Sequence, residues 1–458
     1  MALRPTSLVT AFAPLLAATV LTSCGGGGDA GPDAASGPDA AGEGEPQAPI
    51  DCTAVPCRYV APTTRGDGSG RDWANASGGL PSSPERGSTY LFADGAYGAL
   101  RLDSPDAGGA IITLAKALTD DHGTDVGWTA DDGDGQAELT VVELVTDDWV
   151  IDGRRRDPMD WQRSDAYGFR ITGTLVAHTI NFGRPANRLR FRYLDVGGQP
   201  RGGFDPDLPR EAFYLGGFDQ EVTEWHISAC HVHDVYLPFQ IVGGTDITVE
   251  RTWLGPSWSK EAIRGQGVAA RLTIRDNVFK DACQGTPGDP TATGCTAQIA
   301  AWDGGGAGAF DGTRVWGNLF WMTQPTAHSD ACVFIGGDGG VSAAGVSASD
   351  VVIHHNTFVG IVAGTCSVRT PGDGTGTAAH NNLWVGLGAG VRSECDTASC
   401  EGNVTQPDLT ALVGADQGDF HLAIDVPGSP GLASPFDVDP DGRARGGDGI
   451  WDAGAFER

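Results

Sequence analysis

Hydrophobic and polar residues recur in a fixed order around an asparagine along the second half of the chain. An aliphatic residue stands three positions before this asparagine and an aromatic residue two positions after it, with Ala379 as the clearest departure. The asparagines are Asn277, Asn318, Asn356 and Asn382. Because one local pattern returns each time, the chain is predicted to be built from structural repeats.

Weaker copies of the pattern lie upstream and carry another residue in the asparagine position, namely Leu194, Cys230 and Thr252. Successive positions are 22 to 41 residues apart. The shorter spacings suit one coil of a parallel β-solenoid, and the longer ones suit a coil with an inserted loop. Short β-segments cannot bury their apolar residues alone, so stacked coils with one continuous core are expected.

The repeated asparagine has a structural explanation. Asparagine tolerates the left-handed backbone conformation of a tight corner, and its amide can bond to the asparagine one coil away. We therefore expect Asn277, Asn318 and Asn356 to form a buried column at one corner, with a structural and not a catalytic role.

Composition and charge narrow the class of protein and its partners. The 458 residues include 69 Gly and 27 Pro without a collagen period, which is typical of a turn-rich β-protein. The formal net charge of −29 repels nucleic acid and anionic lipid, so neither is an expected partner. It also disfavours long polyanionic glycans unless Ca²⁺ or an arginine cluster reverses the sign locally. A neutral or mixed-charge polysaccharide is the favoured partner.

Residues 1–24 are predicted to be a lipoprotein signal peptide, with Arg4 before an apolar core at 8–21. The ending Leu21-Thr22-Ser23-Cys24 resembles the bacterial lipobox. That resemblance implies a lipid on Cys24 and, in a Gram-negative organism, sorting to the outer membrane. The alternative is an ordinary cleaved signal peptide with a coincidental cysteine.

Residues 25–50 are rich in Gly, Ala, Pro and acidic residues and are predicted to be a disordered tether. The folded domain is expected to span 51–458. The protein is thus predicted to be exported and lipid-anchored to the outer membrane or cell surface, to touch the membrane only through its lipid, and to be a monomer.

The remaining cysteines agree with an oxidising compartment. Their spacing favours the pairs Cys52–Cys57, Cys283–Cys295, Cys332–Cys366 and Cys395–Cys400. Cys230 is left over in an asparagine position, and we expect it to be a buried free thiol.

Three segments resemble parts of secreted bacterial β-helix proteins of the pectate-lyase-like superfamily. Residues 59–76 resemble their opening segment, residues 121–153 their early coils, including those of chondroitinase-B and alginate-lyase relatives, and residues 434–457 their closing segment. The resemblance implies an all-β fold: a single-stranded right-handed parallel β-helix (solenoid) with inserted loops. It leaves the activity open, because one fold hosts lyases, hydrolases, epimerases and inert adhesins.

Side chains alternate inward and outward along each strand, so the residue two before each asparagine position should point outward. This rule predicts an outward column of Arg192, Ser228, Glu250, Arg275, Trp316, His354 and His380. A sugar chain could stack on Trp316 and form hydrogen bonds with His354 and Arg275. Trp316, His354 and His380 are the substrate-binding candidates. The alternative is a solvated face.

The densest group of candidate catalytic residues is Lys260, Glu261, Arg264, Arg271 and Arg275. β-Elimination of a uronate needs a base and a cation that neutralises the carboxylate, and Lys and Arg can serve. Glu261 before an asparagine coil resembles the catalytic coil of chondroitinase-B-like lyases. That family carries Lys five residues after the Glu, where this chain has Gln266. A mixed-charge loop is the alternative.

Calcium is the candidate metal, and no cofactor is required by the sequence. Asp437, Asp439, Asp441 and Asp448 match the spacing of a twelve-residue Ca²⁺ loop, but the closing turn of a β-helix is the preferred explanation. His231 and His233 have a ligand-like spacing, but two ligands without a third are a weak indication of Zn²⁺.

Three classes of function stay open on these grounds. The first is a surface lipoprotein whose β-helix cleaves polysaccharide as a lyase or glycoside hydrolase. The second is a surface lipoprotein that binds glycan without turnover. The third class is a structural or adhesive surface protein.

Overall fold

The repeat predicted from the asparagine pattern is present as stacked coils in the computed structural model. The structure describes residues 49–105, 109–173, 178–182, 185–198, 211–217, 221–258, 261–282, 284, 297–302, 310–323, 332–335, 348–361, 365–369, 375–388, 392–397, 399–429 and 431–458. All of them lie in one compact unit, Ala35–Arg458. The predicted signal peptide with Cys24, almost all of the tether, Lys260, Cys283 and Cys295 lie outside the described residues.

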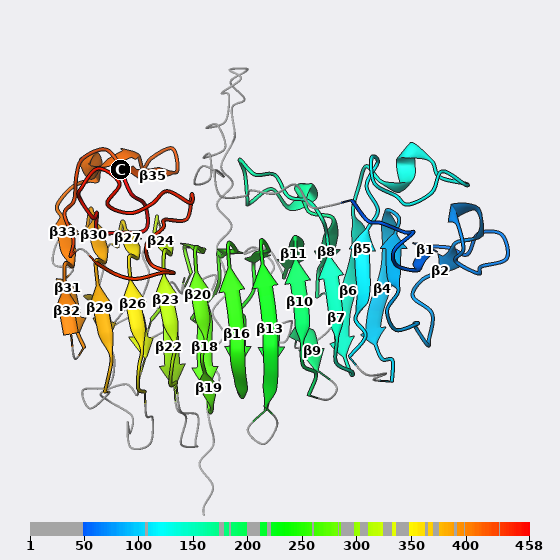
Figure 1. Cartoon of the computed structure of the whole chain (residues 1–458), viewed down its shortest axis with the longest axis horizontal. Helices are drawn as coiled ribbons and strands as arrows, with labels where there is room; N and C mark the ends of the chain where they lie inside the picture. Colours follow the sequence, from blue (N-terminus) through cyan, green and yellow to red (C-terminus); the bar gives the residue numbers. More distant parts are fainter. Residues whose placement is uncertain are drawn as a thin grey trace, which may run out of the picture. The chain divides into compact units, whose positions relative to one another are not determined.

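Each coil contributes one strand to a long sheet, sheet A, in which all neighbouring strands are parallel (Figure 1). Its strands are β2 (Ser77–Gly78), β1 (Cys57–Ala61), β3 (Thr89–Phe92), β5 (Ile112–Lys116), β7 (Trp149–Asp152), β10 (Leu189–Arg192), β13 (Val222–Ser228), β16 (Gly244–Glu250), β20 (Thr273–Arg275), β23 (Arg314–Trp316), β26 (Val352–His354), β29 (Ala378–His380) and β32 (Ser399–Glu401), with β19 (Ala269–Ala270) beside β16.

The other strands form sheet B, which has two parallel rows that meet at β4 (Gly95–Leu102) and β6 (Ala137–Leu144). Row B1 contains β8 (Phe169–Ile171), β11 (Leu194–Gly197), β14 (His231–His233), β17 (Trp253–Leu254), β21 (Val278–Lys280), β24 (Leu319–Trp321), β27 (Thr357–Val359), β30 (Leu383–Val385) and β33 (Val404–Gln406). Row B2 contains β9 (His178–Phe182), β12 (Glu211–Leu215), β15 (Leu237–Ile241), β18 (Ile263–Gln266), β22 (Ile299–Trp302), β25 (Val333–Ile335), β28 (Thr365–Arg369) and β31 (Arg392–Asp396). The predicted right-handed parallel β-helix is thus confirmed.

The hydrophobic positions of the repeat form the core. The aliphatic positions pair in register along sheet A, as in Ile274 beside Val315, and both are buried. The aromatic positions stack in row B1, with ring centroids 4.4 Å apart for Phe279 and Phe320 and 4.7 Å apart for Phe320 and Phe358. Each stacked pair stabilises the fold by about 0.5–1.5 kcal/mol beyond the burial of its area.

The asparagine column is confirmed as a buried ladder between sheet A and row B1. Asn318 donates from Nδ2 to the backbone oxygen of Ile274 at 2.9 Å and to Oδ1 of Asn356 at 2.9 Å. The same amide geometry joins Asn277 to Asn318 and Asn382 to Asn403. Asn403 was not predicted, because Cys400 three positions before it is not aliphatic and Thr405 two positions after it is not aromatic.

The residue in the left-handed conformation is not the asparagine, so this part of the prediction is wrong. The preceding residue has positive φ in coil after coil, as in Asp276 (57°), His355 (52°) and Asn381 (57°). The chain therefore turns one position earlier. The asparagine is left free to direct its backbone N–H and its amide along the stack.

The C-terminal segment covers the outer side of the last coils. It contains the 3-10 turn η5 (Leu409–Ala411) and an antiparallel pair of strands, β34 (Leu412–Gly414) and β35 (Asp419–Leu422). Phe420 packs edge-on against Trp321 of β24, with centroids 4.9 Å apart. Among the described helices, none is long and apolar enough to cross a membrane.

The disulfides agree with the predicted pairing wherever the structure describes the cysteines. Cys52–Cys57, Cys332–Cys366 and Cys395–Cys400 are bonded, and Cys230 is a buried free thiol. Burial raises the pKa of Cys230 to about 12, so the thiol is unreactive at neutral pH. Disulfides of this number are typical of an exported protein.

Candidate functional site

The predicted outward column exists as a row of register partners across sheet A. The aligned residues are Arg192, Ser228, Glu250, Arg275, Trp316, His354 and His380, in that order. The row also extends one coil towards the N-terminus, where Asp152 pairs with Arg192 at 2.7 Å. The alternation of inward and outward side chains along each strand therefore predicts all seven positions of the row correctly.

The C-terminal half of the row is covered, and this changes the view of the three substrate-binding candidates. Phe436 lies edge-on over Trp316 and His354, with ring centroids 5.2 and 5.0 Å apart. Trp316 and His354 are consequently only 6% and 4% exposed. His380 is half-buried and its Nε2 contacts the hydroxyl of Ser399 at 2.9 Å. No sugar can stack on the covered Trp316 while Phe436 stays in place.

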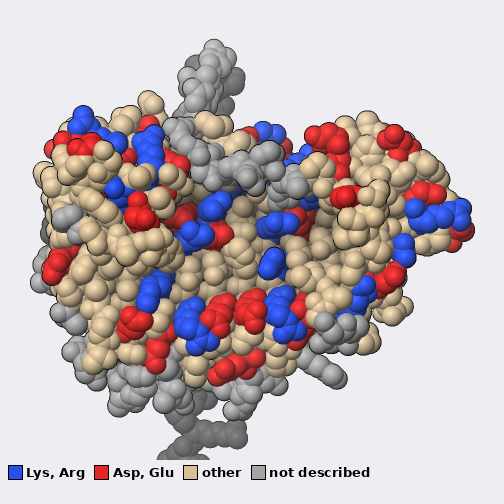
Figure 2. Space-filling view, viewed as in Figure 1, with Lys and Arg blue, Asp and Glu red and all other residues tan. Residues whose placement is uncertain are grey.

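The middle strands of sheet A carry a groove of about 510 Å³. Its lining residues come from β7, β10, β13 and β16 and from the segments before β5, β7 and β10: Gly109, Ile111, Asp148, Val150, Arg188, Arg190, Glu224, Trp225, His226, Asp246 and Thr248. Figure 2 shows basic and acidic side chains side by side across this face, and neither sign dominates it.

Arg190 is the cation that this groove offers to a ligand. It is exposed on β10, between Val150 and His226 in the register. Among the described residues it has no ion-pair partner, whereas Arg188 is paired with Asp148 at 2.6 Å. A guanidinium in this position can donate several hydrogen bonds to hydroxyls or to a carboxylate.

A polar group of three residues lies beside the groove. Nε2 of His226 contacts Oε1 of Glu250 at 2.8 Å, and Arg275 forms an ion pair with the same carboxylate. Burial by itself raises the pKa of Glu250, but the hydrogen bond from His226 and the charge of Arg275 outweigh it and lower the pKa to about 2. Glu250 is therefore ionised at neutral pH.

Asp276 adds a carboxyl group whose pKa is raised instead of lowered. Its Oδ2 lies 3.6 Å from Nη1 of Arg275, and its side chain is 12% exposed. Burial raises the pKa of Asp276 to about 7, against the opposing charge of Arg275. Arg275 thus links an ionised carboxylate to a carboxyl group that exchanges its proton near neutral pH. This pair could not be predicted from the sequence, because each pKa depends on burial and on neighbours from other coils.

The four predicted catalytic residues that the structure describes do not form one site. Lys260 lies outside the described residues, and Glu261 is buried. Arg264 lies on β18 of row B2, aligned with Gln240, whereas Arg275 lies on β20 of sheet A. Arg271 is exposed and pairs with Asp246 at 2.6 Å. Residues close in sequence are here divided between two sheets, and of the four described candidates only Arg275 contributes to the polar group beside the groove.

Three of the four predicted calcium ligands form hydrogen bonds within the C-terminal segment. Oδ1 of Asp439 accepts from the backbone N–H groups of Asp441 and Arg443, and Asp441 pairs with His421. Asp448 accepts from the N–H of Ile450. Within the described part of the chain, no three of Asp437, Asp439, Asp441 and Asp448 have carboxylate oxygens that all lie within 4.8 Å of one another. The closing-turn explanation therefore accounts for them.

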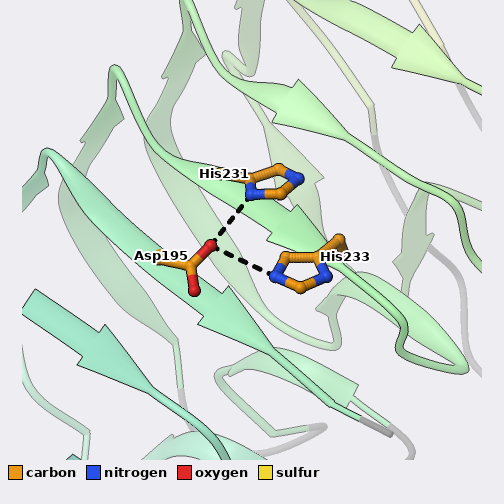
Figure 3. Close-up of side chains that lie close together, drawn as sticks. All are labelled: Asp195, His231 and His233. Atoms are coloured by element: carbon orange, nitrogen blue, oxygen red, sulfur yellow. Dashed lines mark hydrogen bonds and ion pairs between the residues drawn. The ribbon is translucent and has the colours of Figure 1, made fainter. Parts of the chain in front are cut away.

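A compact group of Asp195, His231 and His233 lies on the outer side of row B1 (Figure 3). Asp195 on β11 is the register partner of His231 on β14, and Gly197 is the partner of His233. Oδ1 of Asp195 is 2.8 Å from Nδ1 of His231 and 3.1 Å from Nε2 of His233. The two imidazole rings are stacked at 4.0 Å.

The group is nearly closed to solvent. Exposed fractions of the side chains are 1% for Asp195, 5% for His231 and 16% for His233. Burial alone raises the pKa of Asp195, but hydrogen bonds from the two histidines hold it well below its usual value. Burial lowers the pKa of His231 to about 4. Burial also lowers the pKa of His233, but hydrogen bonds with Asp195 and Asp234 outweigh this effect and raise the pKa to about 9.

Comparisons with known proteins identify the fold. The chain resembles the crystal structure of pectate lyase Pel9A, with a TM-score of 0.53 over 89% of this chain and 100% of that chain. The two sequences are 12% identical in this alignment, so the likeness establishes the pectate-lyase-like β-helix fold and no more than that. No family model and no curated protein matches the sequence.

Proposed function

We propose that the protein acts on an extracellular polysaccharide, which it binds along the open groove of sheet A. The observation that carries this proposal is the groove itself, whose polar side chains repeat from coil to coil along β7, β10, β13 and β16. A ligand built from repeating units matches a surface built from repeating strands about 4.8 Å apart. The pectate-lyase-like fold supports a polysaccharide ligand by analogy.

The charges of the groove favour a neutral or mixed-charge polysaccharide. Arg190 is available for hydroxyls or for an isolated carboxylate, whereas Asp148, Glu224 and Asp246 line the same groove. Together with the net charge of −29, these carboxylates repel a long polyanion.

We further propose that the group beside the groove cleaves the bound chain by acid–base catalysis. Glu250 is ionised and Asp276 has a pKa of about 7, and two carboxyl groups with such different pKa values are suited to the base and acid roles. Arg275 contacts both and positions them. Hydrolysis fits a neutral glycan, because β-elimination requires a uronate carboxylate beside the reacting carbon.

A panel of neutral, mixed-charge and uronate-containing polysaccharides tests the proposal. Reducing-end release detects any cleavage, absorbance at about 235 nm detects only the unsaturated product of elimination, and glycan-array binding detects a ligand without turnover. The proposal expects new reducing ends from a neutral or mixed-charge substrate. Neither binding nor cleavage over the panel would contradict it, and binding without turnover would remove the catalytic part.

Cys24 and the tether complete the proposal. A lipid on Cys24 would hold the β-helix at the outer membrane or cell surface, where extracellular polysaccharide is accessible. The Leu-Thr-Ser-Cys ending and the acidic Gly/Ala/Pro tether support this location.

A further inference from the structure

The group of Asp195, His231 and His233 has the composition of a metal site with two nitrogens and one oxygen. His231 and His233 alone offered only two ligands, and the third is contributed by the preceding coil. Because Asp195 is the register partner of His231, stacking brings it within hydrogen-bond distance of both imidazoles. The three ligand atoms lie within 4.8 Å of one another.

Two of the three distances between ligand atoms are close to those around a coordinated ion. With bonds of about 2.0–2.2 Å, neighbouring ligand atoms of a tetrahedral or octahedral ion are roughly 3.0–3.5 Å apart. The separations of 2.8 and 3.1 Å from Oδ1 of Asp195 to the two nitrogens need to widen by only a few tenths of an ångström. Oδ2 of Asp195 is buried without a hydrogen-bond partner in the described structure, and Nε of Arg170 lies 3.7 Å from it.

The surroundings orient His233 as metal-binding histidines are usually oriented. Nδ1 of His233 contacts Oδ2 of Asp234 at 2.7 Å, which directs Nε2 towards Asp195 and His231. A carboxylate on the far nitrogen of the ring is the common outer partner of a histidine ligand. Gly197 makes room for the ring, since a Cβ at this position would lie 3.0 Å from Nε2 of His233.

We infer that Asp195, His231 and His233 form a binding site for a divalent transition-metal ion of the Zn²⁺ class. Two imidazoles and one carboxylate suit Zn²⁺, whereas Ca²⁺ prefers six to eight oxygen ligands. Three protein ligands leave a position for water, as in catalytic zinc sites. The hydroxyl of Ser164, 3.4 Å from Nδ1 of His231 and from Nε2 of His233, borders that position. The site lies in row B1 and is separate from the groove of sheet A.

Calorimetric titration of the chelator-treated full chain with Zn²⁺, and separately with Ca²⁺, tests this inference. We expect one saturable Zn²⁺ site per chain that Asp195→Asn and His233→Ala remove. Asp234→Asn should weaken binding by about 10- to 100-fold, since it disturbs only the outer partner. His226→Ala is the matched control, because this histidine also contacts a carboxylate but lies on sheet A, and it should leave Zn²⁺ binding unchanged.

Melting curves of every variant establish that it is folded, and the half-exposed Asp234 provides a milder variant should Asp195→Asn fail to fold. Loss of visible Co²⁺ absorption in His233→Ala, with the band retained in His226→Ala, would give independent support. Absence of a saturable Zn²⁺ site in the wild type would overturn the inference. So would equal Zn²⁺ affinity in the wild type and His233→Ala, or a preference of the site for Ca²⁺.

Discussion

Phe436 lies edge-on against Trp316, with the ring centroids 5.2 Å apart. The two residues come from different parts of the molecule, the C-terminal segment and strand β23 of sheet A. Their contact closes the outward row of sheet A beyond Arg275. The position of Phe436 therefore decides which coils a polysaccharide can reach, and it confines the proposed groove to the N-terminal side.

Replacement of Phe436 by Ala should loosen the C-terminal segment. The variant loses the contacts with Trp316 and His354, and we expect the free energy of unfolding to fall by about 1–3 kcal/mol, less than for a fully buried Phe. Thermal melting measures this loss. Val438→Ala is the control in the same segment, since Val438 is 44% exposed and should change stability by less than about 0.5 kcal/mol. Equal effects of the two substitutions would contradict the packing described here.

Substitution of an asparagine should destabilise the protein most in the interior of the asparagine ladder. Asn318→Ala removes the acceptor of the backbone N–H of Asn277, which is buried, and each unsatisfied buried group costs about 1–3 kcal/mol. Asn403→Ala, at the half-buried end of the ladder, should cost less. Urea unfolding of both variants measures the difference. A larger loss for Asn403→Ala would be inconsistent with a buried ladder, and loss of activity without loss of stability in Asn318→Ala would indicate a functional residue.

His421 should make stability depend on pH above neutrality. Its hydrogen bond with Asp441 raises the pKa of His421 to about 9, although partial burial opposes the shift. The folded state thus holds the proton more tightly than the unfolded state, whose pKa is about 6.5. This contribution is fully present below about pH 6.5 and is lost as the pH rises through about 9. In urea unfolding between pH 6 and 10, the stability difference between the wild type and His421→Gln should shrink as the pH rises. A difference that stays constant over this range would exclude the proposed pairing.

Anchorage through Cys24 predicts a simple fractionation result. Cys24→Ser removes the thiol that the lipid would modify, so the protein should move from the membrane fraction to the soluble fraction. Cys230→Ser, which alters a buried thiol in the core, is the control for a general effect of losing a cysteine. Unchanged membrane association of Cys24→Ser would rule out the lipid anchor.

The fold could be predicted because its determinants are local and periodic. The spacing from Ile274 to Asn277 to Phe279 lies within one corner of one coil, and stacking repeats it without any distant information. The alternation of inward and outward side chains along a strand also predicted the positions of Trp316 and His354 in the outward row. It could not show that both are covered, because Phe436 approaches from a segment outside the repeat.

The candidate sites depended on contacts between coils, which the sequence does not display. Asp195 and His231 are 36 residues apart in the sequence, and only the register of β11 and β14 makes them neighbours. Conversely, Arg264 and Arg275 are close in sequence but lie in different sheets. A search for polar residues at equal positions of successive coils could have found Asp195 beside His231, once the coil boundaries were known.

The central claim is that polysaccharide binds and reacts at the open groove of sheet A. Its most direct test measures binding and turnover of the glycan found in the panel with Arg190→Ala and Glu250→Gln. Arg101→Ala, which removes an exposed arginine on β4 of sheet B, is the control. Arg190→Ala should weaken binding by about 10- to 100-fold, the loss of hydrogen bonds from a charged group. Glu250→Gln should retain binding and lower kcat by about 10²- to 10⁴-fold. Wild-type binding and turnover in both groove variants would contradict the account.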